Sequence, residues 1–70
     1  MWQPVKSSNI AEMKHEGEEM QVRFHGGAIY SYQGVPTSVY QAVLGAASVG
    51  RTFNELIKSK PGVYGCCRVN

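Results

Sequence analysis

The sequence predicts a single small α+β domain, in which a three-stranded antiparallel meander is followed by two short helices packed on one face. The chain has 70 residues, which leaves room for one domain only. In its first half apolar and polar residues alternate, as they do in half-buried strands. After Val35-Pro36 the apolar residues recur at helical intervals. We expect one domain over residues 1–70, with a core at 5–60 and a C-terminal tail at 61–70.

The three strands are predicted at residues 10–15, 20–25 and 28–33, after an extended lead-in with a turn at Ser7-Ser8-Asn9. The segment 16–19 supplies the first turn, because Gly17 is free to take a positive φ. Gly26-Gly27 is a strong hairpin signal between the second strand and the third. The three strands therefore form consecutive hairpins.

Two helices are predicted after Pro36. Ser38 and Gln41 have the spacing of a capping box at the start of the first helix. Ser48 is positioned to cap the second helix, which Pro61-Gly62 would stop. The large apolar residues at these strand and helix periods form the predicted core: Val22, Phe24, Tyr40, Leu44, Phe53 and Ile57.

Composition and cysteine placement argue against several classes of protein. No apolar run is long enough to cross a bilayer, and the N-terminus lacks the features of a signal peptide, so we expect a cytoplasmic protein. The two cysteines, Cys66 and Cys67, are adjacent, which excludes both a disulfide framework and the usual spacing of a zinc site. His15 and His25 add no recognisable metal or nucleophile motif. We expect no metal, no cofactor and no catalysis.

The exposure of Tyr30 and Tyr32 depends on the length of the hairpin loop before them. A loop with an even number of residues pairs Phe24 with Ile29, which turns both tyrosines outward beside Arg23 as a stacking platform for bases. A loop with an odd number pairs Phe24 with Ala28, which turns both tyrosines toward the core and exposes Ser31. The odd loop is favoured because it buries more apolar area, at about 25 cal/mol per Å², but both arrangements stay open.

Ser48, Gly50 and Arg51 form a second candidate site at the start of the second helix. Free backbone N–H groups and the positive end of the helix dipole favour an anion there, and Arg51 can clamp a phosphate. The alternative is an ordinary helix start, at which Gly50 makes room for close packing. The net charge of +2 is modest, so the lysines and arginines form either a small basic patch or a scattered surface. The acidic residues cluster elsewhere, at Glu12, Glu16, Glu18 and Glu19.

An ordered set of short segments resembles the KTSC domain, which is named for the C-terminus of some lysyl-tRNA synthetases and also occurs as a free-standing protein. The resemblance covers residues 5–60 and includes the Tyr-x-Tyr pair that is typical of the family. The chain departs from the family at Lys14-His15-Glu16-Gly17, where a Gly-Tyr-Asp-like turn is common. The association with a tRNA synthetase implies RNA binding. The matching segments are 5–10, 22–24, 27–32, 35–36, Tyr40, 47–51, 53–54 and Ile57.

Together these observations predict a small non-catalytic module that binds RNA or another single-stranded nucleic acid. The alternative is a protein-interaction module or homodimer, which would use a sheet edge or an aromatic face. No membrane partner is expected. The candidate nucleic-acid-binding residues are Arg51, Ser48, Gly50, Arg23, Tyr30, Tyr32 and Lys58.

Overall fold

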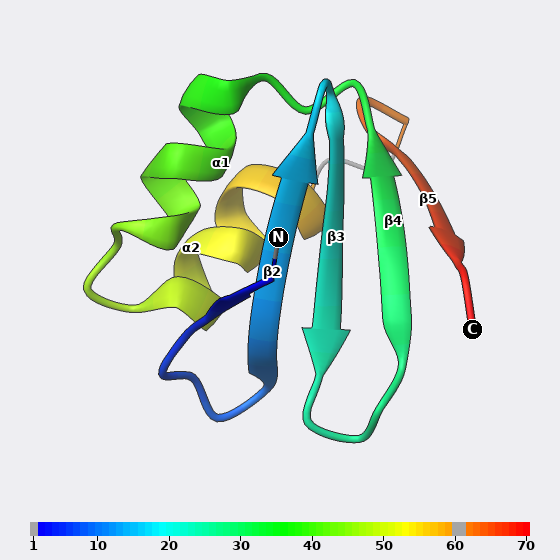
Figure 1. Ribbon diagram of the computed structural model, residues 1–70. Coiled ribbons are helices and arrows are strands. Elements are labelled where there is room, and N and C mark those ends of the chain that lie inside the picture. The colour runs from blue at the N-terminus through cyan, green and yellow to red at the C-terminus, as the bar shows by residue number, and fades with distance from the viewer. Residues whose placement is uncertain (1, 60–61) are drawn as a thin grey trace.

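A five-stranded antiparallel sheet with helices packed on one face forms the domain in the computed structural model, which describes residues 2–59 and 62–70 (Figure 1). The strands follow one another across the sheet in the order in which they occur in the chain. The α+β class is confirmed. The strands are β1 (Gln3–Pro4), β2 (Ile10–Glu16), β3 (Glu19–Phe24), β4 (Ile29–Gln33) and β5 (Gly65–Arg68), and the helices are α1 (Thr37–Leu44), α2 (Val49–Phe53) and η1 (Asn54–Lys58).

The three predicted strands correspond to β2, β3 and β4, with bounds that differ by one residue at most. Gly17 has a φ of 63° in the turn between β2 and β3, as expected. The predicted turn before β2 is also present, because the Ser7 hydroxyl accepts hydrogen bonds from the backbone N–H groups of Asn9 and Ile10, both at 3.2 Å. Local turn chemistry therefore predicted the meander correctly.

The prediction of a three-stranded sheet was wrong, because a further strand pairs along each edge. In the lead-in, β1 pairs with β2 through Gln3 and Met13. Within the predicted tail, β5 pairs with β4, with Cys66 opposite Tyr32. Both added strands are short and every residue in them is exposed, so neither has the apolar alternation by which an internal strand is recognised.

Helix α1 begins earlier than the capping box predicted. Pro36 is its N-cap, and the Pro36 carbonyl accepts hydrogen bonds from Val39 N–H at 3.1 Å and Tyr40 N–H at 3.2 Å. Ser38 therefore already lies inside the helix, and the predicted cap was wrong. Ser48 does occupy the N-cap position of α2, although its side chain makes no capping hydrogen bond.

Helix α2 continues directly into η1, one turn of π-helix that ends at Lys58. Such turns occur mostly as single insertions within α-helices, and often at functional sites. The sequence did not predict this turn. Of the predicted stop at Pro61-Gly62, the proline lies outside the described residues.

The helices lie behind β2 and β3, and they leave β4 and β5 extending beyond them (Figure 1). This placement explains which predicted core residues are buried. Phe53 at the centre is 1% exposed, whereas Phe24 and Leu44 are only partly buried, which corrects their placement in the core. A bulge in β2 between Ile10 and Glu12 turns both Ile10 and Met13 inward. The buried apolar residues are Ile10, Met13, Met20, Val22, Tyr32, Val35, Tyr40, Val43, Val49, Phe53 and Ile57.

Candidate functional site

The hairpin between β3 and β4 has a three-residue loop. Phe24 N–H donates to the Ala28 carbonyl at 2.9 Å, and Gly27 N–H donates back to the Phe24 carbonyl at 2.9 Å. Gly27 has a φ of 99°, the left-handed conformation that such loops place at their last position. Across the ladder Val22 stands opposite Tyr30. Both tyrosines therefore lie on the helix side of the sheet, and the outward-facing platform is wrong.

Tyr32 is a core residue, with 6% of its surface exposed. Its ring packs edge-on against Phe53, with 5.5 Å between centroids. Burial, followed by hydrogen bonding with the Cys66 thiol, raises the pKa of the Tyr32 hydroxyl. Because Tyr32 is buried, it lines the site without offering a free ring face for stacking.

Ser31 faces the opposite side of the sheet, where the loop parity predicted that it would be exposed. It is instead 1% exposed, because neighbouring polar side chains cover it. Its hydroxyl donates to the Glu19 carboxylate at 2.5 Å and accepts from the Gln33 amide at 2.9 Å. The expected exposure was therefore wrong, since hydrogen-bonded polar side chains of β3 and β4 cover the hydroxyl on the outer face.

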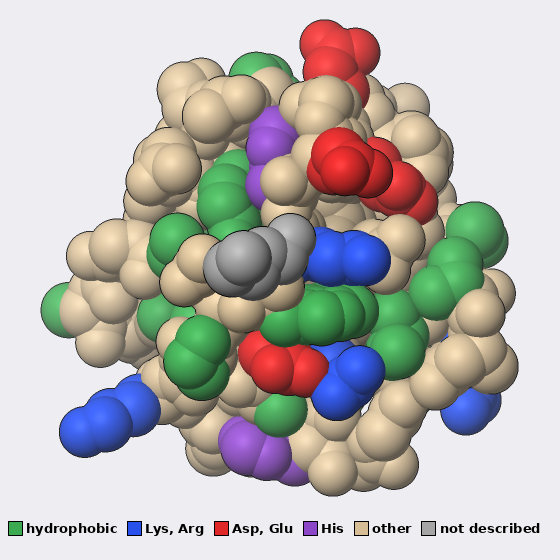
Figure 2. Space-filling view, viewed as in Figure 1, with side chains coloured by type: hydrophobic (Ala, Val, Ile, Leu, Met, Phe, Trp, Pro, Cys, Tyr) green, Lys and Arg blue, Asp and Glu red, His purple; other side chains and the backbone are tan. Residues whose placement is uncertain are grey.

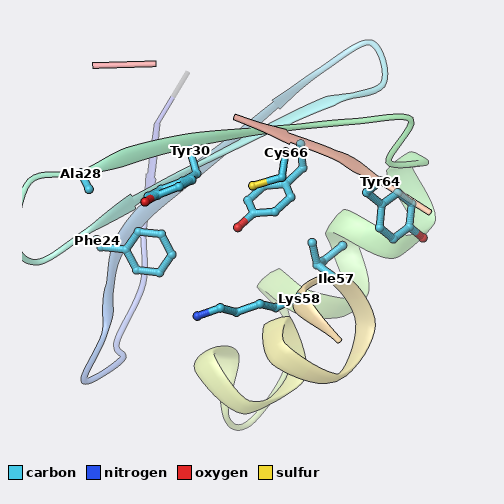
Figure 3. Close-up of a pocket in the computed structure, with 8 residues that line it drawn as sticks. Phe24, Ala28, Tyr30, Ile57, Lys58, Tyr64 and Cys66 are labelled. Atoms are coloured by element: carbon cyan, nitrogen blue, oxygen red, sulfur yellow. The ribbon is translucent and has the colours of Figure 1, made fainter. Parts of the chain in front are cut away.

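An aromatic cleft opens between the uncovered part of the sheet and η1 (Figure 3). Phe24 and Tyr30 meet edge to face at one end, with 5.8 Å between ring centroids. Tyr64 lies at the other end, and Lys58 extends from the helix side toward Phe24 (Figure 3). The cleft has a volume of about 450 Å³ and is lined by Phe24, Ala28, Tyr30, Tyr32, Ile57, Lys58, Tyr64 and Cys66.

Sequence reasoning missed Tyr64 and Cys66 as site residues, because both depend on the unpredicted strand β5. Tyr64 immediately precedes β5, and Cys66 faces Tyr32 within it. No local signal marks either residue. Phe24 was recognised only as a core residue, although it also lines the cleft.

A polar groove runs beside the cleft, between the turn at residues 7–9 and the α2–η1 helix. It consists of two adjoining hollows of about 510 and 490 Å³, which share Ser8, Asn9, Gly50 and Asn54. Lys58 lines both the groove and the aromatic cleft. The side chains that line the groove include three exposed cations and, among the residues that the structure describes, no carboxylate. These cations are Lys6, Arg51 and Lys58.

The wall of this groove is held by close packing between the turn and α2. A Cβ atom added at Gly50 would lie 3.0 Å from the Ser7 hydroxyl oxygen. The Ser7 carbonyl is in turn 2.8 Å from Nε2 of His25. Gly50 thus makes room for the turn, as the packing alternative for this segment predicted. Arg51, one residue further on, is exposed at the rim.

Arg23 lies apart from the other candidate residues, on the outer face of the sheet. Its guanidinium is 2.6 Å from a Glu12 carboxylate oxygen and 5.0 Å from the centre of the Trp2 ring. The Lys14 ammonium lies 4.9 Å from the same ring. Figure 2 shows this face, with cationic side chains on either side of a hydrophobic one and acidic side chains gathered at the upper end. The structure therefore does not bring Arg23 and Arg51 together.

Both histidines have structural contacts. Nε2 of His15 is 2.7 Å from the Val35 carbonyl oxygen, and its ring stacks on Tyr40 with 5.0 Å between centroids. This places His15 on the core side at the end of the sheet. Burial raises the pKa of the Tyr40 hydroxyl. Within residues 2–59 and 62–70, no group of histidine, cysteine and acidic side chains is arranged to hold a metal ion.

None of the helices in the described ranges is both long and apolar enough to cross a membrane. The longest helical stretch in the described part of the chain, α2 together with η1, spans only residues 49–58. A helix that spans a bilayer needs about 20 apolar residues.

Comparisons with known proteins agree with this architecture. The chain matches the model of the KTSC domain over residues 6–60. It is 39% identical over 56 residues to an uncharacterized protein from Stutzerimonas stutzeri, covering 77% of this chain and 79% of that one. A protein from Tsukamurella paurometabola is 40% identical over 60 residues, covering 83% and 90%. A crystal structure of a KTSC domain protein from Yersinia pestis has a TM-score of 0.85 at 30% identity, over 100% of this chain and 97% of that one. The chain therefore belongs to the KTSC domain family.

Proposed function

We propose that this domain is a non-catalytic module that binds single-stranded nucleic acid along the polar groove. The observation that carries the proposal is the charge of the groove: three exposed cations and no carboxylate among its described lining residues. This arrangement favours a nucleic acid as the ligand. Each phosphate that a lysine or arginine neutralises releases a condensed counterion, and this release favours binding.

The uncharged residues of the groove suit the same ligand. Ser8, Asn9 and Asn54 carry hydroxyl and amide groups that can donate to phosphate oxygens or to sugars. Arg51 adds a planar guanidinium, which can bind a phosphate through two parallel hydrogen bonds. Lys58 contributes a point charge where the groove meets the aromatic cleft. We propose Arg51 and Lys58 as the main phosphate contacts and Lys6 as a third.

Arg23 serves as the matched control for this site. Like Arg51 it is an arginine at the surface, but its guanidinium is already paired with Glu12 and lies against Trp2. We therefore leave Arg23 out of the proposed binding site. Its removal changes the net charge of the protein by the same amount as the removal of Arg51 does.

The test is a titration of a short fluorescent oligouridine RNA, followed by anisotropy at several salt concentrations. The wild type should bind with an affinity that falls as salt rises. Arg51→Ala and Lys58→Ala should each weaken binding and reduce the magnitude of the salt slope by about 0.7. Arg23→Ala should retain the slope. A wild type without salt-dependent binding would overturn the proposal, as would an Arg51→Ala variant that binds with an unchanged slope.

The protein-interaction alternative has one observation in its favour, the open edge of β5. All four residues of this strand are exposed, and Val63 and Val69 beside it are 63% and 48% exposed. An edge strand of this kind can pair with a strand from another chain. Self-association that depends on protein concentration and is insensitive to salt, measured by sedimentation, would favour this alternative.

A further inference from the structure

We propose that the aromatic cleft is a pocket for one nucleobase of the strand that occupies the polar groove. This inference rests on the proposed function and names what the cleft would hold. Its starting point is that the cleft and the groove are adjoining spaces with two lining residues in common, Phe24 and Lys58. A nucleotide at this junction can therefore contact an apolar space and a cation at once.

The lining of the cleft matches the faces of a base. The rings of Phe24 and Tyr30 meet at one end and Tyr64 stands at the other, with the aliphatic side chain of Ile57 between the helix and the sheet (Figure 3). Unpaired bases bind to proteins largely by stacking on such rings. Tyr30 and Tyr64 are each only partly buried, so ring surface is available to a ligand.

The volume of the cleft also fits a single nucleobase with its sugar. At about 450 Å³ it lies toward the lower end of the range for small-molecule sites, about 300 to 1,000 Å³. The space lies on the side of the domain where β4 and β5 extend beyond the helices (Figure 1). A single base with its sugar can enter such a space.

The position of Lys58 favours a nucleotide over a purely apolar occupant of the cleft. Its chain lies along the cleft, and the ammonium reaches toward the Phe24 end, where the groove begins (Figure 3). An apolar side chain of a protein partner would gain nothing from a cation at this position. A nucleotide places its base in the cleft and its phosphate beside Lys58, so it uses both features.

The binding chemistry inside the cleft is stacking without sequence readout. The described residues that line the cleft present mainly ring and aliphatic surface, and every base has a face that can stack on such a surface. We infer a pocket that accepts any base and adds affinity to the contacts along the groove.

The experiment compares two short oligouridine RNAs that differ at one terminal nucleotide, one with 2-aminopurine and one with an abasic ribose there. Binding of the first RNA is followed by 2-aminopurine fluorescence. The affinities of both RNAs are measured by their competition with the fluorescent oligouridine RNA. For the wild type we expect stacking to quench the fluorescence. The abasic RNA should bind about five- to 150-fold more weakly, the range that corresponds to the loss of one stacked base.

The variants are Tyr64→Ala, at the rim of the cleft, and Tyr30→Leu, which keeps apolar volume and removes the ring. Each should lose the quenching and the preference for the RNA with the base, while keeping the salt slope of the wild type. Trp2→Leu is the matched control, because Trp2 is an aromatic residue on the outer face that lies against Lys14 and Arg23. It should behave as the wild type. Amide spectra establish that each variant is folded.

The outcomes separate this inference from the proposed function. Salt-dependent binding with equal affinity for both RNAs would overturn the base pocket and leave the groove as the binding site. Equal quenching in the wild type and in a folded Tyr64→Ala variant would overturn it as well. Absence of salt-dependent binding in the wild type would overturn both proposals together.

Discussion

The Ser31 hydroxyl donates a hydrogen bond to the Glu19 carboxylate across the β3–β4 ladder, at 2.5 Å. Ser31 is 1% exposed, so a carboxylate at the surface satisfies a buried hydroxyl beneath it. The Gln21 amide also donates to this carboxylate, at 3.2 Å. The bond from Ser31, followed by the bond from Gln21, holds the pKa of Glu19 below its ordinary value of 4.5.

This depressed pKa predicts a loss of stability in acid. Because the folded state lowers the pKa of Glu19, the carboxylate contributes stability above its ordinary pKa and loses it as pH falls through the lowered value. Glu19→Gln should melt below the wild type at neutral pH, and the difference should shrink below about pH 4. Melting temperatures measured as a function of pH check this prediction. Glu18→Gln, in the turn just before β3, is the control, and an equal pH dependence in both variants would contradict the assignment.

The burial of Phe53 predicts a large cost of truncation. Its side chain is 1% exposed and contacts Phe24 and Tyr32 edge-on. Phe53→Ala should lower the free energy of unfolding by about 3–5 kcal/mol, which is enough to unfold much of a domain of this size. Phe24→Ala should cost less, because Phe24 is partly exposed beside the cleft. Urea titrations would rank the two variants, with Val63→Ala as an exposed control expected within about 0.5 kcal/mol of the wild type.

The contact between Gly50 and Ser7 predicts a specific double-mutant result. Gly50→Ala would place a methyl group 3.0 Å from the Ser7 oxygen, which two backbone N–H groups hold in place. It should destabilise the domain by about 1–3 kcal/mol, the usual cost of overpacking. In a Ser7→Ala background the same substitution should cost much less, because the clashing atom is gone. Gly26→Ala is the control, since a Cβ atom there meets nothing within 4 Å. Equal costs of Gly50→Ala in both backgrounds would show that the contact is unimportant.

The side chain of Asn70, just beyond the end of β5, holds this end of the chain against the start of β4. Its side chain accepts a hydrogen bond from Ile29 N–H at 2.9 Å and donates to the Gly27 carbonyl at 2.8 Å. Asn70→Ala should remove about 0.5–1.5 kcal/mol for each bond from the local stability of this end of the ladder. Amide hydrogen exchange should accelerate at Ile29 and Val69 and stay unchanged at Met13, in the middle of the sheet. Uniform acceleration at all three amides would indicate a global effect instead.

The sequence predicts those features of the fold that are formed by residues close together in the chain. The turn at Gly17 and the strands on either side of it were found because a glycine and an apolar alternation lie within a few residues of each other. The parity of the loop before β4 was not decided, because Gly26-Gly27 suits a two-residue turn as well as the observed three-residue loop. In the structure, the hydrogen bonds between Phe24 and residues 27–28 and the packing of Tyr32 on Phe53 distinguish the two loops.

The site was less predictable than the fold. Arg51, Ser48, Gly50 and Lys58 do lie along one groove, but Arg23 is on the opposite face of the sheet. The cleft depends on β5, whose exposed residues show no alternation and whose place is set by backbone pairing with β4. Pairing between residues so far apart in the chain leaves no pattern in either segment alone.

The ladder between β4 and β5 also has a consequence for the order in which the domain assembles. The strands β2, β3 and β4 are joined by short turns, whereas Gln33 pairs with Gly65 across all of residues 34–64, which include both helical segments. Closing a long loop costs more entropy than closing a short one, so we expect this ladder to form after the others. Since Tyr64 and Cys66 complete the cleft, folding intermediates that lack β5 would have no such pocket. If the cleft holds a base as proposed, transient opening of the same ladder would give that base a route out of the cleft.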